Sequence, residues 1–185
     1  MDCLLSNPQL SEIKENFIKY KKNIQPLVAQ ICTQKMNGMH GLNTHTAAVV
    51  FRGIDYALSL NKNPWPVIFA CACHDMARMN DSFDTEHGKN AIPLAKQIMK
   101  KFNLDKETQN SINFAIENHT TGIIAPDYIS ACLWDADRTR LSWDYGYDSK
   151  YFNTLRAKQI ASNDFKKYIE FQRQCFPELI WDKIY

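Results

Sequence analysis

The sequence predicts an all-α fold on three observations. Apolar residues recur at three- and four-residue steps along most of the 185-residue chain, which is the spacing of one face of an α-helix. No segment alternates apolar and polar residues as a half-buried strand does. The chain has only 6 glycines and 7 prolines, too few for a turn-rich β-sandwich. Its length and its 45% hydrophobic content predict one globular helical bundle over residues 1–185.

The first two expected helices lie before Pro64. Helical spacing predicts helix over 10–31, with Leu10, Ile13, Phe17, Ile18, Ile24, Leu27, Val28 and Ile31 on its apolar face. Thr44 is an N-cap candidate for the next helix, which we expect to run to Leu58. The segment Asn61–Pro64 then breaks the helical pattern.

The stretch over 64–78 is apolar on every side up to Cys73, which predicts a central, buried helix that begins at Pro64 or Pro66. A polar loop follows over 79–88, before an amphipathic helix over 89–102. Asp105 is the expected N-cap of a helix whose apolar stripe contains Ile112, Ala115 and Ile116. Further helices are expected over 126–141 and 152–171.

The formal net charge of +2 argues against a dedicated nucleic-acid surface or a polybasic membrane surface. No run approaches the roughly 18–20 apolar residues of a membrane span. The first residues carry Asp2, Glu12 and Glu15 without the basic and apolar regions of a secretory signal. We therefore expect a cytoplasmic protein.

The six cysteines are scattered and form no CxxC motif, which favours reduced thiols over a disulfide framework. Cys71 and Cys73 directly precede His74, a position that also admits a metal-binding role. The simpler interpretation is that both are small apolar residues of a buried helix.

All five histidines lie between His40 and His119, and one forms the pair His74–Asp75. This pair falls where an apolar helix turns polar, at the rim of a buried surface. Imidazole and carboxylate groups together suit a divalent metal ion. The ends of other expected helices carry further ligand types, namely His45, His87, His119, Asp135 and Asp137. Taken singly, each histidine is better explained by a hydrogen bond to a backbone group than by metal binding, and each aspartate could be a solvated helix charge.

The ordered set resembles the HD-domain metal-dependent phosphohydrolase superfamily. Its H…HD…D pattern corresponds here to His45, His74–Asp75 and Asp137, within a motif-bearing core over about 38–141. His87 and His119 fill the places of the two extra histidines in binuclear members. The resemblance implies an HD-type bundle and a site for two divalent ions, bridged by Asp75. The implied ligands are His45, His74, Asp75, His87, His119 and Asp137.

Two details limit the resemblance. The spacing from Asp75 to Asp137 is short, and no GYP tripeptide follows His119, so the cyclic-dinucleotide subgroup is not supported. Asp137 is preferred to Asp135 as the last ligand because of its ADR context, and Asp135 is left as a residue that could orient a ligand.

The resemblance implies hydrolysis of a small phosphoester, such as a nucleotide, by a metal-bridging hydroxide, in a phosphomonoesterase or a phosphodiesterase. Asp75 and Arg78 are the candidate catalytic residues. Arg78 lies four residues after His74, hence on the same side of the expected helix, and its guanidinium suits phosphate. Lys89 and His40 are further substrate-binding candidates. The metals remain open among Mn, Fe, Co, Ni, Zn and Mg.

Two alternatives stay open. HD-fold di-iron oxygenases have nearly the same ligand types, and a non-catalytic metal-binding helical module would keep the ligands without turnover. Outside the motif, Arg138 and Arg140 are expected to be solvated charges or partners of acids such as Asp144. An aromatic cluster between Trp134 and Phe152 is expected to form core and lid packing.

Overall fold

The computed structural model describes residues 7–33, 38–82, 84–141 and 146–177. Within these ranges every regular element is helical, so the all-α prediction is confirmed. The single-domain organisation stays a prediction. The α-helices are α1 (Asn7–Asn23), α2 (Gln25–Ile31), α3 (His45–Ser59), α4 (Pro64–Cys73), α5 (His87–Lys100), α6 (Lys106–Glu117), α7 (Tyr128–Arg138), α9 (Leu155–Gln159) and α10 (Phe165–Cys175). A short 3₁₀ helix covers Ser149–Tyr151, and a π-helical turn over Ile160–Asp164 joins α9 to α10.

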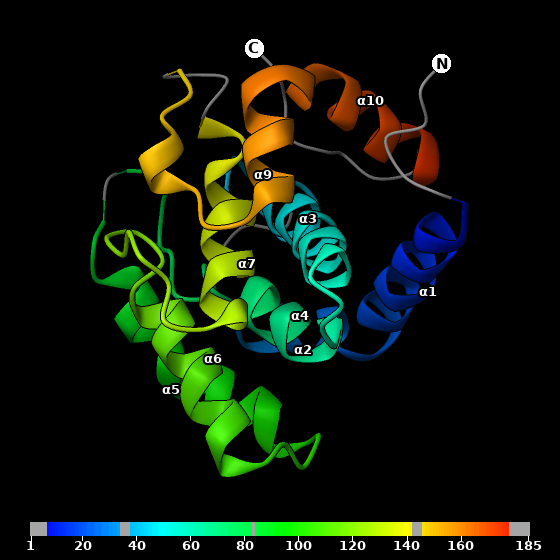
Figure 1. The fold of residues 1–185 in the computed structure, drawn as a ribbon. Coiled ribbons are helices and arrows are strands. Elements are labelled where there is room, and N and C mark those ends of the chain that lie inside the picture. Colours follow the sequence, from blue (N-terminus) through cyan, green and yellow to red (C-terminus); the bar gives the residue numbers. More distant parts are fainter. Residues whose placement is uncertain (1–6, 34–37, 83, 142–145, 178–185) are drawn as a thin grey trace.

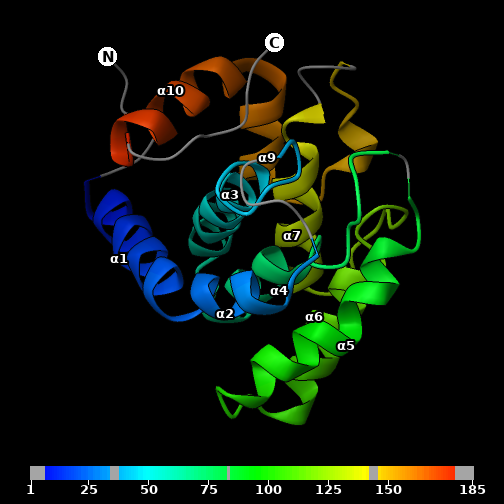
Figure 2. The ribbon, with the colours of Figure 1, turned by 180° about the vertical axis from the view of Figure 1, so that it is seen from behind.

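Helix α4 is the centre of the bundle, as its uniformly apolar sequence predicts. It packs against α3, α6 and α7, while α5 and α6 pair beside them and α1 lies on the opposite side (Figure 1). Asn63 caps the helix by accepting a hydrogen bond from the backbone N–H of Trp65 at 3.0 Å. The view from behind shows the same surrounded position (Figure 2).

A close approach joins α3 to α4. A Cβ added to Gly53 on α3 would lie 2.6 Å from the Sγ atom of Cys71 on α4, so only glycine fits there. Cys71 and Cys73 are both fully buried, and burial raises the pKa of both thiols, that of Cys73 to about 12. They therefore serve as small apolar core residues, as the sequence indicated.

Polar groups attach α3 to α7. The Nε atom of the fully buried Arg52 donates to the carbonyl oxygen of Ala136 at 2.6 Å, and Tyr56 shares a 2.8 Å hydrogen bond with Thr139. Both contacts involve the last turn of α7 or the residue after it. They hold the end of α7 against the middle of α3.

Several element boundaries differ from the sequence prediction. The first segment divides at Ile24 because Pro26 starts a new helix, and Ile18 is 54% exposed and lies outside the apolar face. Helix α4 ends at Cys73 rather than continuing to residue 78. Helix α5 begins two residues earlier than expected, at His87. The expected helix over 126–141 is shorter, from Tyr128 to Arg138, and the expected helix over 152–171 is interrupted by the π-helical turn.

Capping residues explain other boundaries. Asp105 caps α6 as predicted, since its Oδ1 accepts from the N–H of Thr108 at 2.8 Å. Thr44 precedes α3 as predicted, but its hydroxyl donates to the carbonyl oxygens of Gly38 and Gly41 instead of capping the helix. None of the helices in the described ranges has both the length and the apolar character needed to cross a membrane.

Candidate metal centre

Six imidazole and carboxylate side chains meet where five helices begin or end. His45 begins α3, His87 begins α5, and His119 lies two residues after the end of α6. His74 and Asp75 directly follow α4, and Asp137 lies in the last turn of α7. The six are thus all the residues that the H…HD…H…H…D pattern selected. All are buried except Asp137, whose side chain is 19% exposed.

The Asp75 carboxylate lies between two pairs of histidines. Its Oδ1 atom is 2.9 Å from Nε2 of His87 and 3.8 Å from Nε2 of His119. Its Oδ2 atom is 3.3 Å from Nε2 of His74 and 3.8 Å from Nε2 of His45. One carboxylate therefore faces both halves of the cluster.

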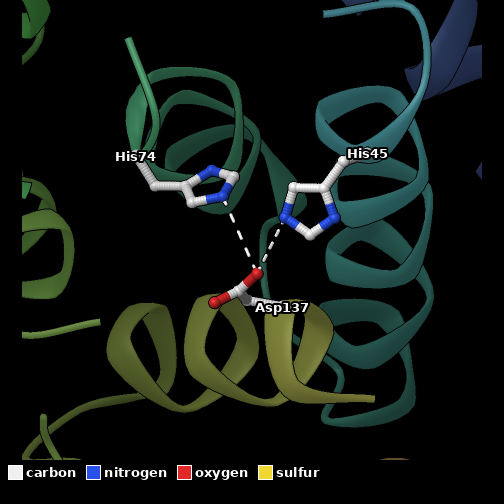
Figure 3. A group of neighbouring side chains, drawn as sticks. All are labelled: His45, His74 and Asp137. Carbon is white, nitrogen blue, oxygen red and sulfur yellow. Dashed lines mark ion pairs between the residues drawn. The ribbon is translucent and has the colours of Figure 1, made fainter. Parts of the chain in front are cut away.

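Asp137 completes the half that contains His45 and His74. Its Oδ1 atom is 2.9 Å from Nε2 of His45 and 3.8 Å from Nε2 of His74. Figure 3 shows both rings directed at this carboxylate from the start of α3 and the end of α4. Four ligand-type groups thus surround one point, counting Asp75.

Backbone carbonyls fix the orientation of three of the rings. Nδ1 of His74 lies 2.7 Å from the carbonyl oxygen of Cys71, and Nδ1 of His119 lies 2.6 Å from that of Ile116. Nδ1 of His87 contacts the carbonyl oxygen of Asp84 in the same way. A carbonyl oxygen only accepts hydrogen bonds, so each Nδ1 carries a hydrogen, and each ring in its neutral form directs an Nε2 lone pair at the cluster.

These lone pairs require a positive charge between them. Nε2 of His87 lies 2.8 Å from Nε2 of His119, and both atoms also face a carboxylate oxygen. Nε2 of His74 is buried without a hydrogen-bond partner among the described residues. Acceptor atoms so close together repel unless a proton or a metal ion separates them. The residues therefore fit divalent ions, and two overlapping groups of three, His45 with His74 and Asp137, and His74 with Asp75 and His119, have geometry that could hold one.

The pKa values follow the same logic. Burial alone would raise the pKa of Asp75, but the charge that His74 carries when it is protonated and the hydrogen bond from His87 outweigh burial and hold the pKa well below the usual range. The hydrogen bond and charge of His45 likewise lower the pKa of Asp137. Burial lowers the pKa of His119 to about 4, with the positive charge of His74 adding to the effect. At neutral pH both carboxylates are charged and His119 is neutral, which are the forms that bind metal.

One of three comparisons with known proteins found a match, and it concerns the fold. Neither a protein-family model nor a curated protein sequence matches the chain. Its fold is similar to the crystal structure of a predicted HD superfamily hydrolase from an uncultured Thermotogales bacterium, with a TM-score of 0.62. The match covers 86% of this chain and 92% of that one, at 18% sequence identity. The chain has the HD-superfamily fold. The resemblance seen in the sequence is thereby confirmed at the level of the fold.

Within this HD fold, Gly88 allows the two histidines of one half of the cluster, His87 and His119, to meet. A Cβ at Gly88 would lie 2.6 Å from the carbonyl oxygen of Ile116 and 3.0 Å from Nδ1 of His119. The start of α5 therefore lies directly against the end of α6. This contact brings the neighbouring His87 ring beside His119.

Arg78 lies at the site, but for a different reason than its spacing from His74 suggested. Since α4 ends at Cys73, Arg78 belongs to a turn in which its backbone N–H donates to the carbonyl oxygen of Asp75. Its Nε donates to the Asp75 carboxylate at 3.1 Å and its NH1 group to the carbonyl oxygen of Ser82. Arg78 therefore holds Asp75 in place and leaves part of its guanidinium for a ligand.

Arg138 was misjudged from the sequence. It is buried rather than solvated, and it makes hydrogen bonds to the carbonyl oxygens of His119, Gly122 and Tyr151. It therefore holds the segment after His119 against α7. The only sequence signal was its place beside Asp137. Asp144, named as a possible partner, lies outside the described residues.

Asp135 faces away from the cluster. Its carboxylate accepts hydrogen bonds from the backbone N–H groups of Asn153, at 2.8 Å, and Thr154, at 2.6 Å. It holds the chain before α9 instead of orienting one of the six cluster residues. The sequence had left that orienting role open.

Of the two remaining substrate-binding candidates, one lies at the cavity and the other does not. His40 lines the cavity above the cluster and shares a 2.8 Å contact between its Nδ1 and Oδ1 of Asp81. Lys89 is exposed on α5, and it is not among the residues that line this cavity. The aromatic prediction holds for Trp134, a core residue that donates to the carbonyl oxygen of Ala115, while Trp143 and Tyr145 lie outside the described residues.

A cavity of about 460 Å³ lies over the cluster. Its wall includes His45, Asp75, His119 and Asp137 from the cluster, together with Arg78, Arg138 and Arg140. Three arginines beside a polar, buried His/Asp cluster suit an anionic ligand.

Proposed function

We propose that the chain is a metal-dependent phosphohydrolase that acts on a small phosphoester, such as a nucleotide, with two divalent ions held by the six clustered residues. The observation that supports this most is the position of Asp75, whose two oxygens face separate pairs of imidazoles. A carboxylate in that position is suited to bridge two ions.

The donor sets of the two ions follow from the distances. His45 and His74 lie near Oδ2 of Asp75, and together with Asp137, which faces both of these rings, they would hold one ion. His87 and His119 lie around Oδ1 and would hold the other. A pair of divalent ions would lower the pKa of a bound water to about 7 and would neutralise negative charge on the phosphate oxygens.

The chain itself supplies binding and orientation. Arg78 holds Asp75 through Nε and lines the cavity, so its remaining N–H groups are available to a phosphate oxygen. Arg140 lines the same cavity. Arg138 keeps the backbone of His119 in place, which fixes that ring relative to His87.

Metal content and turnover test the proposal together. Protein purified without chelator and without an affinity histidine tag is compared with His87→Ala. We expect about two metal equivalents in the native chain and about one in the variant, with hydrolysis across a phosphoester panel reduced at least roughly 100-fold, since one of two ions is lost. Asn90→Ala, an exposed change in the same turn of α5, is the control.

Each other result has a definite meaning. One equivalent in both proteins contradicts the two-ion site. Absence of metal even after reconstitution contradicts the proposal as a whole. Iron with O₂-dependent turnover would support the oxygenase alternative, and bound metal without any turnover would support the non-catalytic one.

A further inference from the structure

A second cavity adjoins the one over the metal cluster. It has a volume of about 670 Å³, within the usual range for small-molecule sites, and Thr120, Arg138 and Leu141 line both cavities. Its other walls come from the segment after α6 and from residues 146–152, which lie on the same side of α7 (Figure 1). A molecule bound at the metal cluster can therefore extend into it.

The charged groups of this second cavity are already engaged in an ion pair or in hydrogen bonds. Lys150 forms a 2.8 Å ion pair with Asp148. Arg138 directs its guanidinium at three backbone carbonyl oxygens, those of His119, Gly122 and Tyr151. A second phosphate would need N–H groups that are not committed in this way. The cavity is therefore suited to an uncharged group.

Its remaining walls include apolar and aromatic side chains beside Thr120 and Thr121. Ile123, Leu141 and Tyr151 are 48%, 43% and 41% exposed, and together they give the cavity an apolar patch. Phe152 is buried beneath them and stacks on Tyr147 with a centroid distance of 5.5 Å and an interplanar angle of 29°. Such a surface matches the face of a flat ring.

We propose that the second cavity binds the organic group of the substrate, a flat and uncharged ring system, while the phosphate lies at the metal cluster. This inference rests on the proposed function for the phosphate end. Ile123 is then a specificity-determining residue, because it lines the ring subsite and is absent from the wall of the metal cavity.

Two esters with the same phosphate test the inference. The kcat/KM for 1-naphthyl phosphate is divided by that for glycerol 2-phosphate in the native chain, in Ile123→Asp and in Ile124→Asp. Ile124 is the matched control, since it is 87% exposed and does not line the cavity. We expect a ratio above about 10 in the native chain and in Ile124→Asp. In Ile123→Asp the ratio falls about tenfold, mainly through KM, because a charge replaces apolar contact with the ring.

Binding of 1-naphthol, followed by its fluorescence, provides a readout that needs no turnover. Ile123→Asp is expected to weaken this binding about tenfold and Ile124→Asp to leave it unchanged. If this pattern holds but neither ester is hydrolysed, the ring subsite stands and the proposed function fails. If both esters are hydrolysed with the same ratio in all three proteins, the ring subsite is wrong and the proposed function stands.

Discussion

Asp135 and Asp137 lie two residues apart on α7, yet opposite kinds of groups surround their carboxylates. Asp135 accepts hydrogen bonds from N–H donors of Asn153 and Thr154. Asp137 faces the Nε2 atoms of His45 and His74 at 2.9 and 3.8 Å. Residues two apart on a helix point about 200° from each other, so the same helix turn serves both a structural contact and the candidate metal site.

The same contrast separates Asp55 from Asp75. Asp55 is fully buried but lies among donors, since Arg156, Tyr168 and Gln9 all hydrogen-bond to it. Asp75 is also buried, but most of its neighbours are imidazole nitrogens. The difference teaches that burial alone does not mark a metal ligand in this chain. The carboxylates of the candidate metal site are distinguished by their neighbours, which are mostly imidazole Nε2 atoms rather than hydrogen-bond donors.

The largest effect is expected when each of the two aspartates of α7 is replaced by asparagine in a separate variant. We expect Asp137→Asn to lower metal affinity and hydrolysis by at least about 100-fold, because a charged ligand becomes neutral. Asp135→Asn should keep the metal content but reduce the free energy of unfolding by about 1–3 kcal/mol, because an NH₂ group would face N–H donors. Metal analysis and urea unfolding of both variants measure this. Equal metal loss in the two would contradict the distinction.

A smaller effect is expected at Gly88, where the two helices that carry His87 and His119 meet. Gly88→Ala would place a methyl group 2.6 Å from a backbone oxygen, which must shift at a cost of about 1–3 kcal/mol. The His119 ring would move with it, so we also expect weaker metal binding. Thermal unfolding with and without metal checks both effects. Unchanged stability and metal content would show that the contact can relax without disturbing the site.

The smallest expected effect is a pH dependence of stability that arises from Asp55, a carboxylate surrounded by hydrogen-bond donors. Burial raises the pKa of Asp55, against the opposing effects of the Arg156 charge and the hydrogen bonds from Tyr168, Arg156 and Gln9. The folded chain then holds the proton more tightly than the unfolded chain, so this contribution to stability is present at low pH and is lost as pH rises through the folded pKa. Each unit by which the pKa is raised corresponds to about 1.4 kcal/mol.

Urea unfolding of the native chain and Asp55→Asn between pH 3.5 and 7 measures this contribution. The difference in unfolding free energy, native minus variant, should fall as pH rises above 3.8, the pKa of an unperturbed aspartate. A difference that rises with pH would mean that Arg156 and Tyr168 outweigh burial.

Much of the fold was predictable from the sequence because local rules set it, and the cluster was predictable because its ordered motif resembles that of the HD-domain superfamily. Asn63 and Asp105 mark helix starts through their own side chains, and the uniformly apolar run to Cys73 indicates a central helix. The order of the five motif segments, from His45 to Asp137, was enough to select side chains that the fold brings together. Their roles as ligands remain to be tested.

The functions of the arginines were not predictable because they depend on where helices end and on distant backbone. Arg78 reaches Asp75 through a turn that exists only because α4 stops at Cys73. Arg138 is held by carbonyl oxygens 13 to 19 residues away, which no local pattern reports. The donors around Asp135 likewise come from a later segment, so the sequence could not separate it fully from Asp137.

The bonds from the rings of His74 and His119 to carbonyl oxygens three residues earlier have a kinetic consequence. The carbonyls of Cys71 and Ile116 belong to the last turns of α4 and α6, where helices leave carbonyl groups unpaired. Each ring thus closes the last turn of its own helix by donating a hydrogen bond to a carbonyl oxygen there. Fraying of either helix end would free the ring from this hydrogen bond. A metal ion bound to the ring would oppose the fraying and so slow hydrogen exchange of the backbone amides in the same last turn.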